Sequence, residues 1–413
     1  MYKLTPMALA LSLLSGYAVA QSAPNAAIPQ QHDIYKSFDT YKPNEQADPD
    51  GAMRVGNFFL YPRVGVSVGH DDNVTAVNSK KVSSAVWNLS PAALLERTNG
   101  GDRYTLGYSG SYTQYANSSN DNTDLHEFQG QAAVQYDDRL NTLFRAGVLL
   151  SADPRETTDR ASAAKPDEFR NSYTGYLVGY GAPEAQGRLE AEINYNNKRY
   201  TNNRATTADG DFAALDTAGR FYYRVAPNSK VFVEGRYTDY DYKLASPDQD
   251  STEQRVLLGV TWEATAATQG TVKAGNLKKD FAQASRRDFS GLTWEGAVRW
   301  SPVEYSVVDL NTRRATDDSS GTGDYIKRSS YGLQWNHKLT DLFSTVLGYT
   351  YTDSKYVGAT RHDKNKSYKA GVAYDARRWM KVSLEWTTAD NNSTVQDKSF
   401  KRNVIMLNTL IGL

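Results

Sequence analysis

A two-residue alternation of apolar and polar side chains recurs from Asn57 to the C-terminus, and it limits the possible folds more than any other feature. The stretch from Ser367 to Trp386, SYKAGVAYDARRWMKVSLEW, shows it in two arms separated by a polar turn at Asp375–Arg378. The apolar positions are Tyr368, Ala370, Val372 and Tyr374 on the first arm, and Met380, Val382, Leu384 and Trp386 on the second. Successive side chains of a β-strand point to opposite faces of a sheet, so the stretch predicts an amphipathic β-hairpin.

Similar segments follow one another along the chain. Clear ones lie near 58–68, 104–108, 128–136, 144–150, 189–195, 231–237, 256–262, 294–300 and 331–335. Weaker ones lie near 82–97, 167–181, 211–225, 270–282, 304–315 and 398–413. Together with the hairpin they predict about 18 strands, with 16 as the alternative, an even number as in bacterial single-chain barrels. No segment with helical periodicity is long enough to compete.

The connections between these segments are of two kinds, and the two kinds alternate. Short, turn-like connections lie at 99–101, 137–138, 226–228, 301–302 and 340–341. Long polar connections lie at 70–81, 152–166, 200–211, 243–251, 314–324, 353–365 and 389–398. Outer-membrane barrels alternate short periplasmic turns with longer external loops. The predicted fold is therefore all-β: a transmembrane, antiparallel, up-and-down β-barrel with both termini in the periplasm.

The composition agrees with a barrel that has a polar interior. Hydrophobic residues reach only 39% of 413 residues, and aromatic residues reach 12%, with 28 Tyr against 13 Phe. This hydrophobic fraction is low for a soluble protein with a packed core of this size. It agrees with a barrel whose apolar side chains form a band on the outer surface. The formal net charge of +0 argues against nucleic acid as a partner. The absence of Cys is compatible with the periplasm but decides little.

The N-terminus predicts export. Residues 1–20 contain Lys3, an apolar run from Met7 to Leu14 and a small-residue cleavage site ending at Ala20, as in a secretory signal peptide. The apolar run is too short to span a membrane, and no later stretch reaches about 20 consecutive apolar residues. Residues 21–56 have no periodicity and are interpreted as a flexible periplasmic segment: a tether, a docking peptide or a plug. The barrel is expected to occupy residues 57–413.

A barrel of about 18 strands encloses an aqueous lumen. The polar face of each predicted strand gives the candidate lumen-lining residues, which are Arg103, Glu127, Arg145, Glu190, Glu192, Arg220, Arg224, Glu234, Arg236, Arg255, Glu263, Glu295, Arg299, Lys369, Lys381 and Glu385. As a set they predict a path for a hydrophilic or anionic solute, with tyrosines available to stack on sugar rings. For any single residue, the simpler interpretation is that barrel walls need mutually paired charges. No cofactor or metal is expected.

An enzyme is the remote alternative. The histidines are His32, His70, His126, His337 and His362, and none lies in a G-x-S-x-G or H-E-x-x-H motif. The densest polar cluster is His70-Asp71-Asp72-Asn73 at the first loop. It could serve as a hydrolytic site or a calcium loop. A strand end that enters a turn rich in Asp and Asn explains it more simply.

Three stretches resemble a known family: FFLYPRVGVSVGHDDNV (58–74), NLSPAALLER (88–97) and RYTLGYSGSYTQYANSSNDNTDLHEF (103–128). They are similar to the start of the outer-membrane β-barrel porins associated with exopolysaccharide biosynthesis and export, and the resemblance continues to Leu413. It implies a Gram-negative outer-membrane protein that serves export of an exopolysaccharide or capsular polysaccharide. The implied partners are membrane lipid, the polysaccharide and periplasmic polysaccharide-export or modification proteins. A general or small-solute diffusion porin is the alternative. One departure is the end, NTLIGL, which lacks the usual aromatic last residue.

Overall fold

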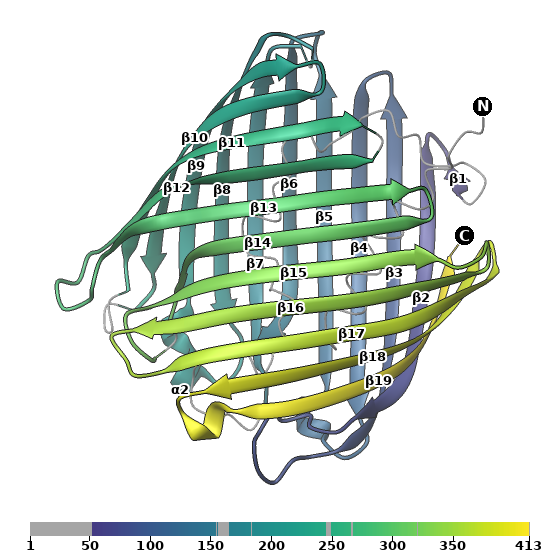
Figure 1. Cartoon of the computed structure of the whole chain (residues 1–413), viewed down its shortest axis with the longest axis vertical. Coiled ribbons are helices and arrows are strands. Elements are labelled where there is room, and N and C mark those ends of the chain that lie inside the picture. The colour runs from purple at the N-terminus through teal and green to yellow at the C-terminus, as the bar shows by residue number, and fades with distance from the viewer. Residues whose placement is uncertain are drawn as a thin grey trace.

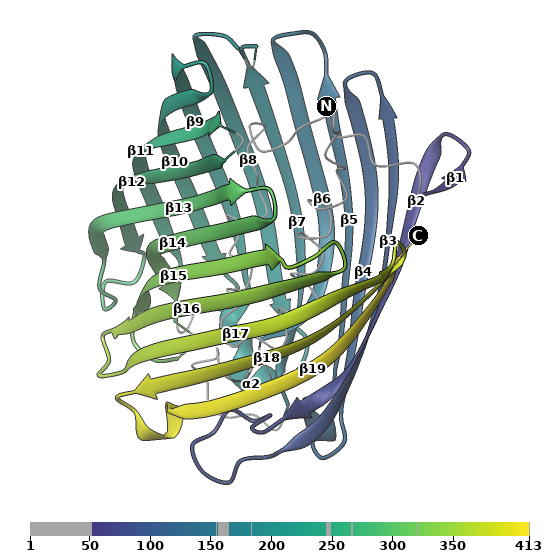
Figure 2. The same cartoon turned by 45° about the vertical axis from the view of Figure 1, so that its right-hand side comes forward.

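The chain forms a closed antiparallel β-barrel (Figures 1 and 2). The computed structural model describes residues 52–153, 155, 165–182, 184–244, 249–265, 267–319 and 321–412. Strands β2 to β19 each pair with their neighbours in sequence, and β19 pairs with β2 to close the cylinder. The predicted all-β barrel of 18 strands is confirmed. The predicted signal peptide, 1–20, and most of the predicted flexible segment, 21–56, lie outside the described residues.

The barrel strands have similar lengths. They are β2 (Phe58–Asp71), β3 (Ser84–Asn99), β4 (Asp102–Tyr115), β5 (Thr123–Gln135), β6 (Leu140–Asp153), β7 (Asp167–Tyr180), β8 (Gly187–Tyr200), β9 (Phe212–Ala226), β10 (Ser229–Tyr242), β11 (Ser251–Thr265), β12 (Thr268–Phe281), β13 (Phe289–Val303), β14 (Ser306–Asp318), β15 (Tyr325–Lys338), β16 (Phe343–Val357), β17 (His362–Arg377), β18 (Met380–Ser393) and β19 (Phe400–Gly412). Each is long enough to cross a bilayer when tilted.

The connections separate the two ends of the barrel. The loop end carries 72–83, 116–122, 154–166, 201–211, 243–250, 282–288, 319–324, 358–361 and 394–399. The turn end carries 100–101, 136–139, 181–186, 227–228, 266–267, 304–305, 339–342 and 378–379. The first barrel strand begins and the last one ends at the turn end, which corresponds to the periplasmic side of such barrels. The loops at 116–122 and 282–288 are not among the connections that the sequence predicts.

Two predicted turns lie a few residues further along the chain than expected. Strand β13 continues through Pro302, and the turn is at 304–305. A register shift between Trp300 and Val303 makes room there for a residue that cannot donate to the ladder. Strand β17 likewise continues to Arg377, with a register shift after Asp375, so the turn predicted at Asp375–Arg378 is at 378–379.

One short strand was not predicted. Strand β1 (Met53–Val55) lies within the segment interpreted as flexible, and it pairs with the start of β2, with Met53 opposite Leu60. Gly56 joins the two strands with φ +63°, a left-handed conformation that glycine adopts without strain. The helical elements that the structure describes are single turns in the loops, such as α2 (Arg204–Thr207), and none is long and apolar enough to cross a membrane.

Outward-facing side chains supply the apolar band. On β18, Leu384 is 56% exposed, and its neighbours across the strands are Val372 and Leu407, which are exposed as well. In a membrane the lipid acyl chains surround such side chains. The hydrogen bonds of the closed sheet satisfy the backbone N–H and C=O groups. The alternate positions Ser383 and Glu385 face inward. The hairpin of β17 and β18 therefore has the two faces that its sequence predicts.

A charge on the outward face is expected to be costly. Replacing Leu384 by lysine should destabilise the barrel by about 2–4 kcal/mol if this position lies near the bilayer midplane, because the ammonium group has no water there. The same change at the inward neighbour Ser383 should cost much less. Urea unfolding in lipid vesicles would measure both, and equal costs would contradict the assignment of the two faces.

Candidate functional site

Charged side chains gather on the inner face of β8 to β13. They alternate along each strand with exposed apolar side chains, so they lie on the face opposite the lipid. Of the sixteen candidate lining residues, ten lie on these strands, and seven of the ten form one cluster: Glu190, Glu192, Arg220, Glu234, Arg236, Arg255 and Glu295. Most of them are buried against one another, which makes this part of the barrel a continuous layer of alternating charge. We refer to these residues and their ion-pair partners as the charged wall.

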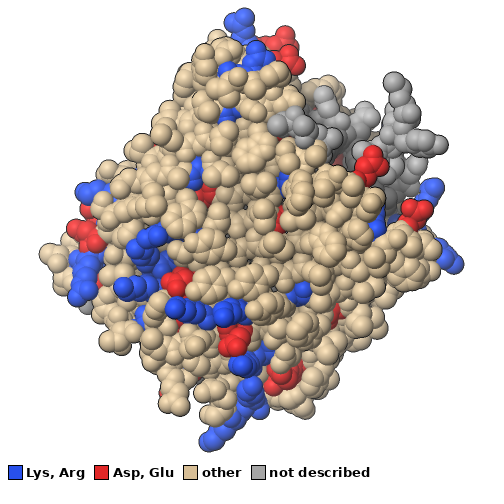
Figure 3. All heavy atoms as spheres, viewed as in Figure 1, with Lys and Arg blue, Asp and Glu red and all other residues tan. Residues whose placement is uncertain are grey.

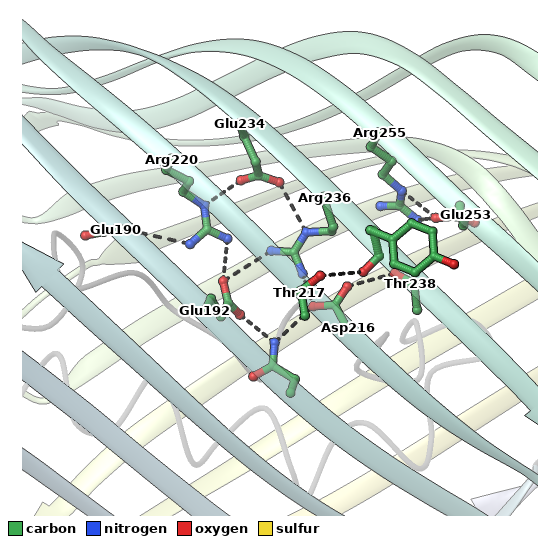
Figure 4. Close-up of polar contacts among 12 residues, drawn as sticks. Glu190, Glu192, Asp216, Thr217, Arg220, Glu234, Arg236, Thr238, Glu253 and Arg255 are labelled. Carbon is green, nitrogen blue, oxygen red and sulfur yellow. Dashed lines mark hydrogen bonds and ion pairs between the residues drawn. The ribbon is translucent and has the colours of Figure 1, made fainter.

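Arg220 on β9 lies at the centre of the charged wall. Figure 4 shows its guanidinium between three carboxylates from the two adjacent strands. Its nitrogens lie 2.5 Å from Glu234, 2.6 Å from Glu192 and 3.7 Å from Glu190. Arginine suits this position because its planar group donates in several fixed directions at once.

Arg236 on β10 repeats the arrangement one strand further along. It contacts Glu192 and Glu234, each at 3.3 Å, and pairs with Asp216 on β9 (Figure 4). The hydroxyl of Thr238 also donates to Asp216, at 2.8 Å. Each carboxylate is therefore held by more than one donor. Because a buried charge is costly unless it is paired and hydrogen-bonded, the network is stable only as a whole.

The charged wall continues through β11 to β13. Lys273 on β12 bridges Glu234 at 3.3 Å and Glu295 at 3.0 Å. Arg255 contacts Glu295 at 3.3 Å and donates to Glu253 on its own strand at 2.5 Å. These ion pairs join side chains of the same strand or of strands no more than two places apart in the sheet. The charges are thus neutralised along the wall.

The opposite part of the inner face carries mainly neutral polar side chains. They come from β16 to β19 and from β2 to β5, and they include Thr350, Thr352, Ser354, Asn365, Ser367, Thr387, Asn391, Ser67, Asn88, Ser109, Gln129 and Gln131. The charged wall therefore faces a part of the barrel that has many neutral hydrogen-bonding side chains and carries its charges as separate ion pairs. The sequence predicted the polarity of the lumen but not this division.

The remaining candidate lining residues also lie on inward-facing positions. Most of them contact another side chain of the inner face. These pairs are Arg103 with Glu96 (2.7 Å), Glu127 with Tyr173 (3.0 Å), Arg299 with Asp309 (2.7 Å), Lys369 with Glu385 (3.0 Å) and Lys381 with Asp375 (3.5 Å). Arg145 lies opposite Gln131, on the same face as Glu127. Arg224 and Glu263 lie near the turn end of β9 and β11, where Glu263 is exposed.

Sequence reasoning missed several members of the charged wall. Glu253 and Lys273 are central to it, and Asp216 and Arg188 extend it, with Arg188 at 3.2 Å from Glu190. All four follow the same two-residue alternation as the residues that were found. The signal was therefore present, but Arg188 and Glu253 lie just outside the clear segments 189–195 and 256–262, and Asp216 and Lys273 lie on the weaker segments 211–225 and 270–282.

The loop end of β14 and β15 is folded into the barrel. Pairing between β13 and β14 stops at Trp294 opposite Arg314, although β13 begins at Phe289 and β14 runs to Asp318. Figure 1 shows the two strands parting toward the loop end. We call residues 315–319 and 321–328 of this hairpin the inward hairpin end.

Contacts of the inward hairpin end fix its position. Alternation would place Thr316 and Asp318 on the lipid side, yet they contact inward-facing residues of β10 to β12. The Thr316 hydroxyl donates to Glu253 at 3.2 Å. Asp318 accepts a hydrogen bond from the Tyr242 hydroxyl at 2.6 Å and pairs with Lys279, which is 1% exposed. The inward hairpin end therefore covers part of the charged wall and narrows the barrel at its loop end.

An aromatic cluster supports the same contact. The Tyr325 ring lies 6.2 Å from the ring of Phe281 and 5.7 Å from that of Phe289, between centroids. Lys327 lies over the Phe289 ring at 5.9 Å. The hairpin end is thus held by apolar contacts as well as by buried polar ones.

A family comparison identifies the chain. The model of the family described as "Putative beta-barrel porin 2" matches residues 47–411. The chain belongs to this family. It is thus an outer-membrane β-barrel porin, as the resemblance in its first strands implied.

Solved porin structures share the fold at low sequence identity. OccAB2 from Acinetobacter baumannii is 12% identical, with a TM-score of 0.50 over 87% of this chain and 98% of its own. OccK2 (OpdF) from Pseudomonas aeruginosa is 10% identical, with a TM-score of 0.49 over 86% and 98%. A BenF-like porin from Pseudomonas fluorescens Pf-5 is 10% identical, with a TM-score of 0.49 over 87% and 100%. No functionally curated protein matches the sequence.

Three residues of the cluster at His70–Asn73 add side-chain contacts to the pairing of β2 with β19 that closes the barrel of this porin. Asp71 on β2 binds the Arg402 guanidinium on β19, with the shortest contact at 2.6 Å. Asp72 accepts hydrogen bonds from the backbone and side-chain nitrogens of Asn403, both at 2.7 Å. The side-chain amide of Asn73 donates to the backbone of Lys401 at 2.8 Å. The cluster therefore joins the first and last strands, and this agrees with the simpler interpretation of a strand end entering a polar turn.

Neither of the other interpretations of that cluster gains support. Its carboxylates are already bound by donors on β19. Within the ranges that the structure describes, no group of three or more His, Asp or Glu side chains could hold a metal ion.

Proposed function

We propose that this porin provides a passive, water-filled path across the outer membrane for small hydrophilic solutes. The observation that carries the proposal is that the charges of the wall are paired along the sheet, between strands no more than two places apart. Charges satisfied in this way need no partner from across the barrel. The wall can thus surround water without losing its stability.

The division of the lumen favours neutral and dipolar solutes such as small saccharides. Solutes that pass beside the charged wall can orient in its field and exchange hydrogen bonds with the Ser, Thr and Asn side chains on the opposite side. Because the charged wall contains both signs, we expect only weak discrimination between anions and cations. An anionic solute, which the sequence suggested, is therefore less favoured than a neutral one.

Reconstitution tests this function. The purified full-length protein in planar bilayers should give stable channels with similar permeability for potassium and chloride, and proteoliposomes should swell in small sugars. A protein that is folded, as shown by heat-dependent gel migration, but gives neither conductance nor swelling would contradict the proposal.

Export of an exopolysaccharide, with periplasmic partners, is the second candidate. Two observations favour it: the family resemblance, and the inward hairpin end, which would limit leakage through a wide barrel between transport events. It predicts low conductance of the purified protein and loss of polymer secretion in a clean deletion strain. Complementation with and without residues 21–52 would show whether the N-terminal segment takes part. Normal secretion in the deletion strain, with large conductance in bilayers, would exclude this candidate.

A further inference from the structure

The outer surface of the barrel carries a basic patch at its loop end. We define the basic patch as Lys355 on β16 and Lys364 and Lys366 on β17, all exposed and on outward-facing positions. Lys327 on β15 lies directly opposite Lys355 in the ladder. Figure 3 shows Lys and Arg gathered on the side of the molecule where these strands reach the loop end.

The lysines of the basic patch lack ion-pair partners among the residues that the structure describes. Two carboxylates lie opposite them in the ladder, Asp353 across from Lys364 and Asp390 across from Lys366, and each has its ion pair with another residue. Asp353 contacts His362 at 3.0 Å and the Tyr351 hydroxyl at 3.4 Å. Asp390 pairs with Lys401 at 3.2 Å. Two carboxylates, each shared with another residue, therefore stand against three lysines on adjacent strands, and this positive excess would be stabilised by an anion.

The depth of the patch is set by the aromatic residues below it. On β17 the outward positions from the turn end are Tyr374, Val372, Ala370 and Tyr368, and Lys366 follows directly. Tyr368 packs against Tyr349 with centroids 5.0 Å apart, as expected of the ring of aromatic residues at a membrane interface. Lys366 lies two residues beyond Tyr368, about 7 Å along the strand, at the height of the lipid head groups.

The rest of the loop end does not share this character. Outward-facing charges at the loop ends of β7 to β12 are of both signs, and they are Glu168, Arg170, Arg199, Asp239, Asp241, Lys278 and Asp280. Lys278, for example, is paired with Asp280 at 2.7 Å. Arg170 and Arg199 also lie opposite one another, but four of these seven charges are carboxylates, so β7 to β12 have no positive excess at their loop ends.

We propose that the basic patch binds the phosphate groups of an anionic glycolipid of the outer leaflet. The loop end of an outer-membrane barrel faces that leaflet, and lysines at head-group depth attract phosphate. The acyl chains would lie along the apolar band below, beside Tyr349 and Tyr368. This site is on the outer surface, so it is independent of what the lumen conducts.

Native mass spectrometry of the detergent-solubilised full-length porin tests the proposal. A bis-phosphorylated glycolipid of the outer leaflet should bind, and the variant Lys355→Gln/Lys364→Gln/Lys366→Gln should bind it about 100-fold more weakly, because each lysine near a phosphate contributes roughly a fivefold gain in affinity. Inorganic phosphate at the same concentration should neither bind nor raise the melting temperature, which separates a lipid from a free anion.

A matched control is available in the loops. The variant Lys80→Gln/Lys81→Gln/Lys243→Gln removes the same charge from exposed positions beyond the membrane surface and should bind glycolipid as the wild type does. Heat-dependent gel migration checks that both variants are folded. Equal binding of the dephosphorylated glycolipid, or undiminished binding by the patch variant, would overturn the proposal.

Discussion

Replacing Asp71 by alanine is expected to destabilise the barrel by about 3–5 kcal/mol, the cost of removing one partner of a buried ion pair. Asp71 and Arg402 are 1% and 5% exposed, and the aspartate contacts both Nε and Nη2 of the arginine. The substitution leaves the guanidinium buried without this carboxylate, and the backbone N–H of Asn73 loses its acceptor as well. Since the pair joins β2 to β19, the loss falls on the contact that closes the barrel. Urea unfolding in vesicles would measure it.

Two further substitutions distinguish loss of the ion pair between β2 and β19 from a general effect of removing a carboxylate. Asp124→Ala removes an exposed carboxylate near the loop end of β5 and should leave stability unchanged. Asp72→Ala removes acceptors from Asn403, an uncharged partner, and should cost only about 1 kcal/mol. An Asp71 variant as stable as the Asp124 variant would show that the ion pair does not hold the barrel closed.

The fold could be predicted because a period of two fixes two properties at once. It identifies each strand, and it assigns each side chain to the lipid or the lumen. That is why residues as distant in sequence as Arg103 and Glu385 were both placed on the inner face. Barrel closure then follows, because strands in lipid cannot leave an edge unpaired.

The partners within the lumen could not be predicted in the same way. Alternation says that Arg220 and Glu234 face inward, but the register of β9 against β10 decides that they lie directly opposite one another. Register depends on turn geometry and small irregularities, such as the shift at Ser229, and a sequence pattern does not resolve these. For the same reason the role of Asp71 was not foreseen, since its partner Arg402 lies at the other end of the chain.

The inward hairpin end is the clearest exception to alternation. Parity assigns Asp318, the last residue of β14, to the outward face of the barrel. Separation of β14 from β13 beyond Arg314 instead lets that face turn onto the wall, where Asp318 meets Lys279 and Tyr242. Outward-facing charges such as Asp239 and Asp241 occur at other loop ends without a strand leaving the wall, so the sequence pattern alone did not reveal this departure.

Asp318→Ala is accordingly expected to increase single-channel conductance. The substitution removes the carboxylate paired with buried Lys279, at a cost of about 3–5 kcal/mol to the docked arrangement. That corresponds to a shift of more than 100-fold in the equilibrium between docked and released hairpin ends. Release would widen the loop end of the lumen, and planar-bilayer recordings of the purified protein would detect it.

The charge-exchanged variant Lys279→Asp/Asp318→Lys provides the decisive comparison. It keeps the opposite charges in contact with their positions reversed, so it should return conductance toward the wild-type value, whereas general loosening of the barrel would not be corrected. Asp241→Asn changes the same charge on the outer side of β10, beside Tyr242, and should leave conductance unchanged. If Asp318→Ala is folded and conducts as the wild type does, the prediction is wrong. The inward hairpin end is then a fixed part of the wall, and the ion pair between Asp318 and Lys279 does not control the width of the lumen.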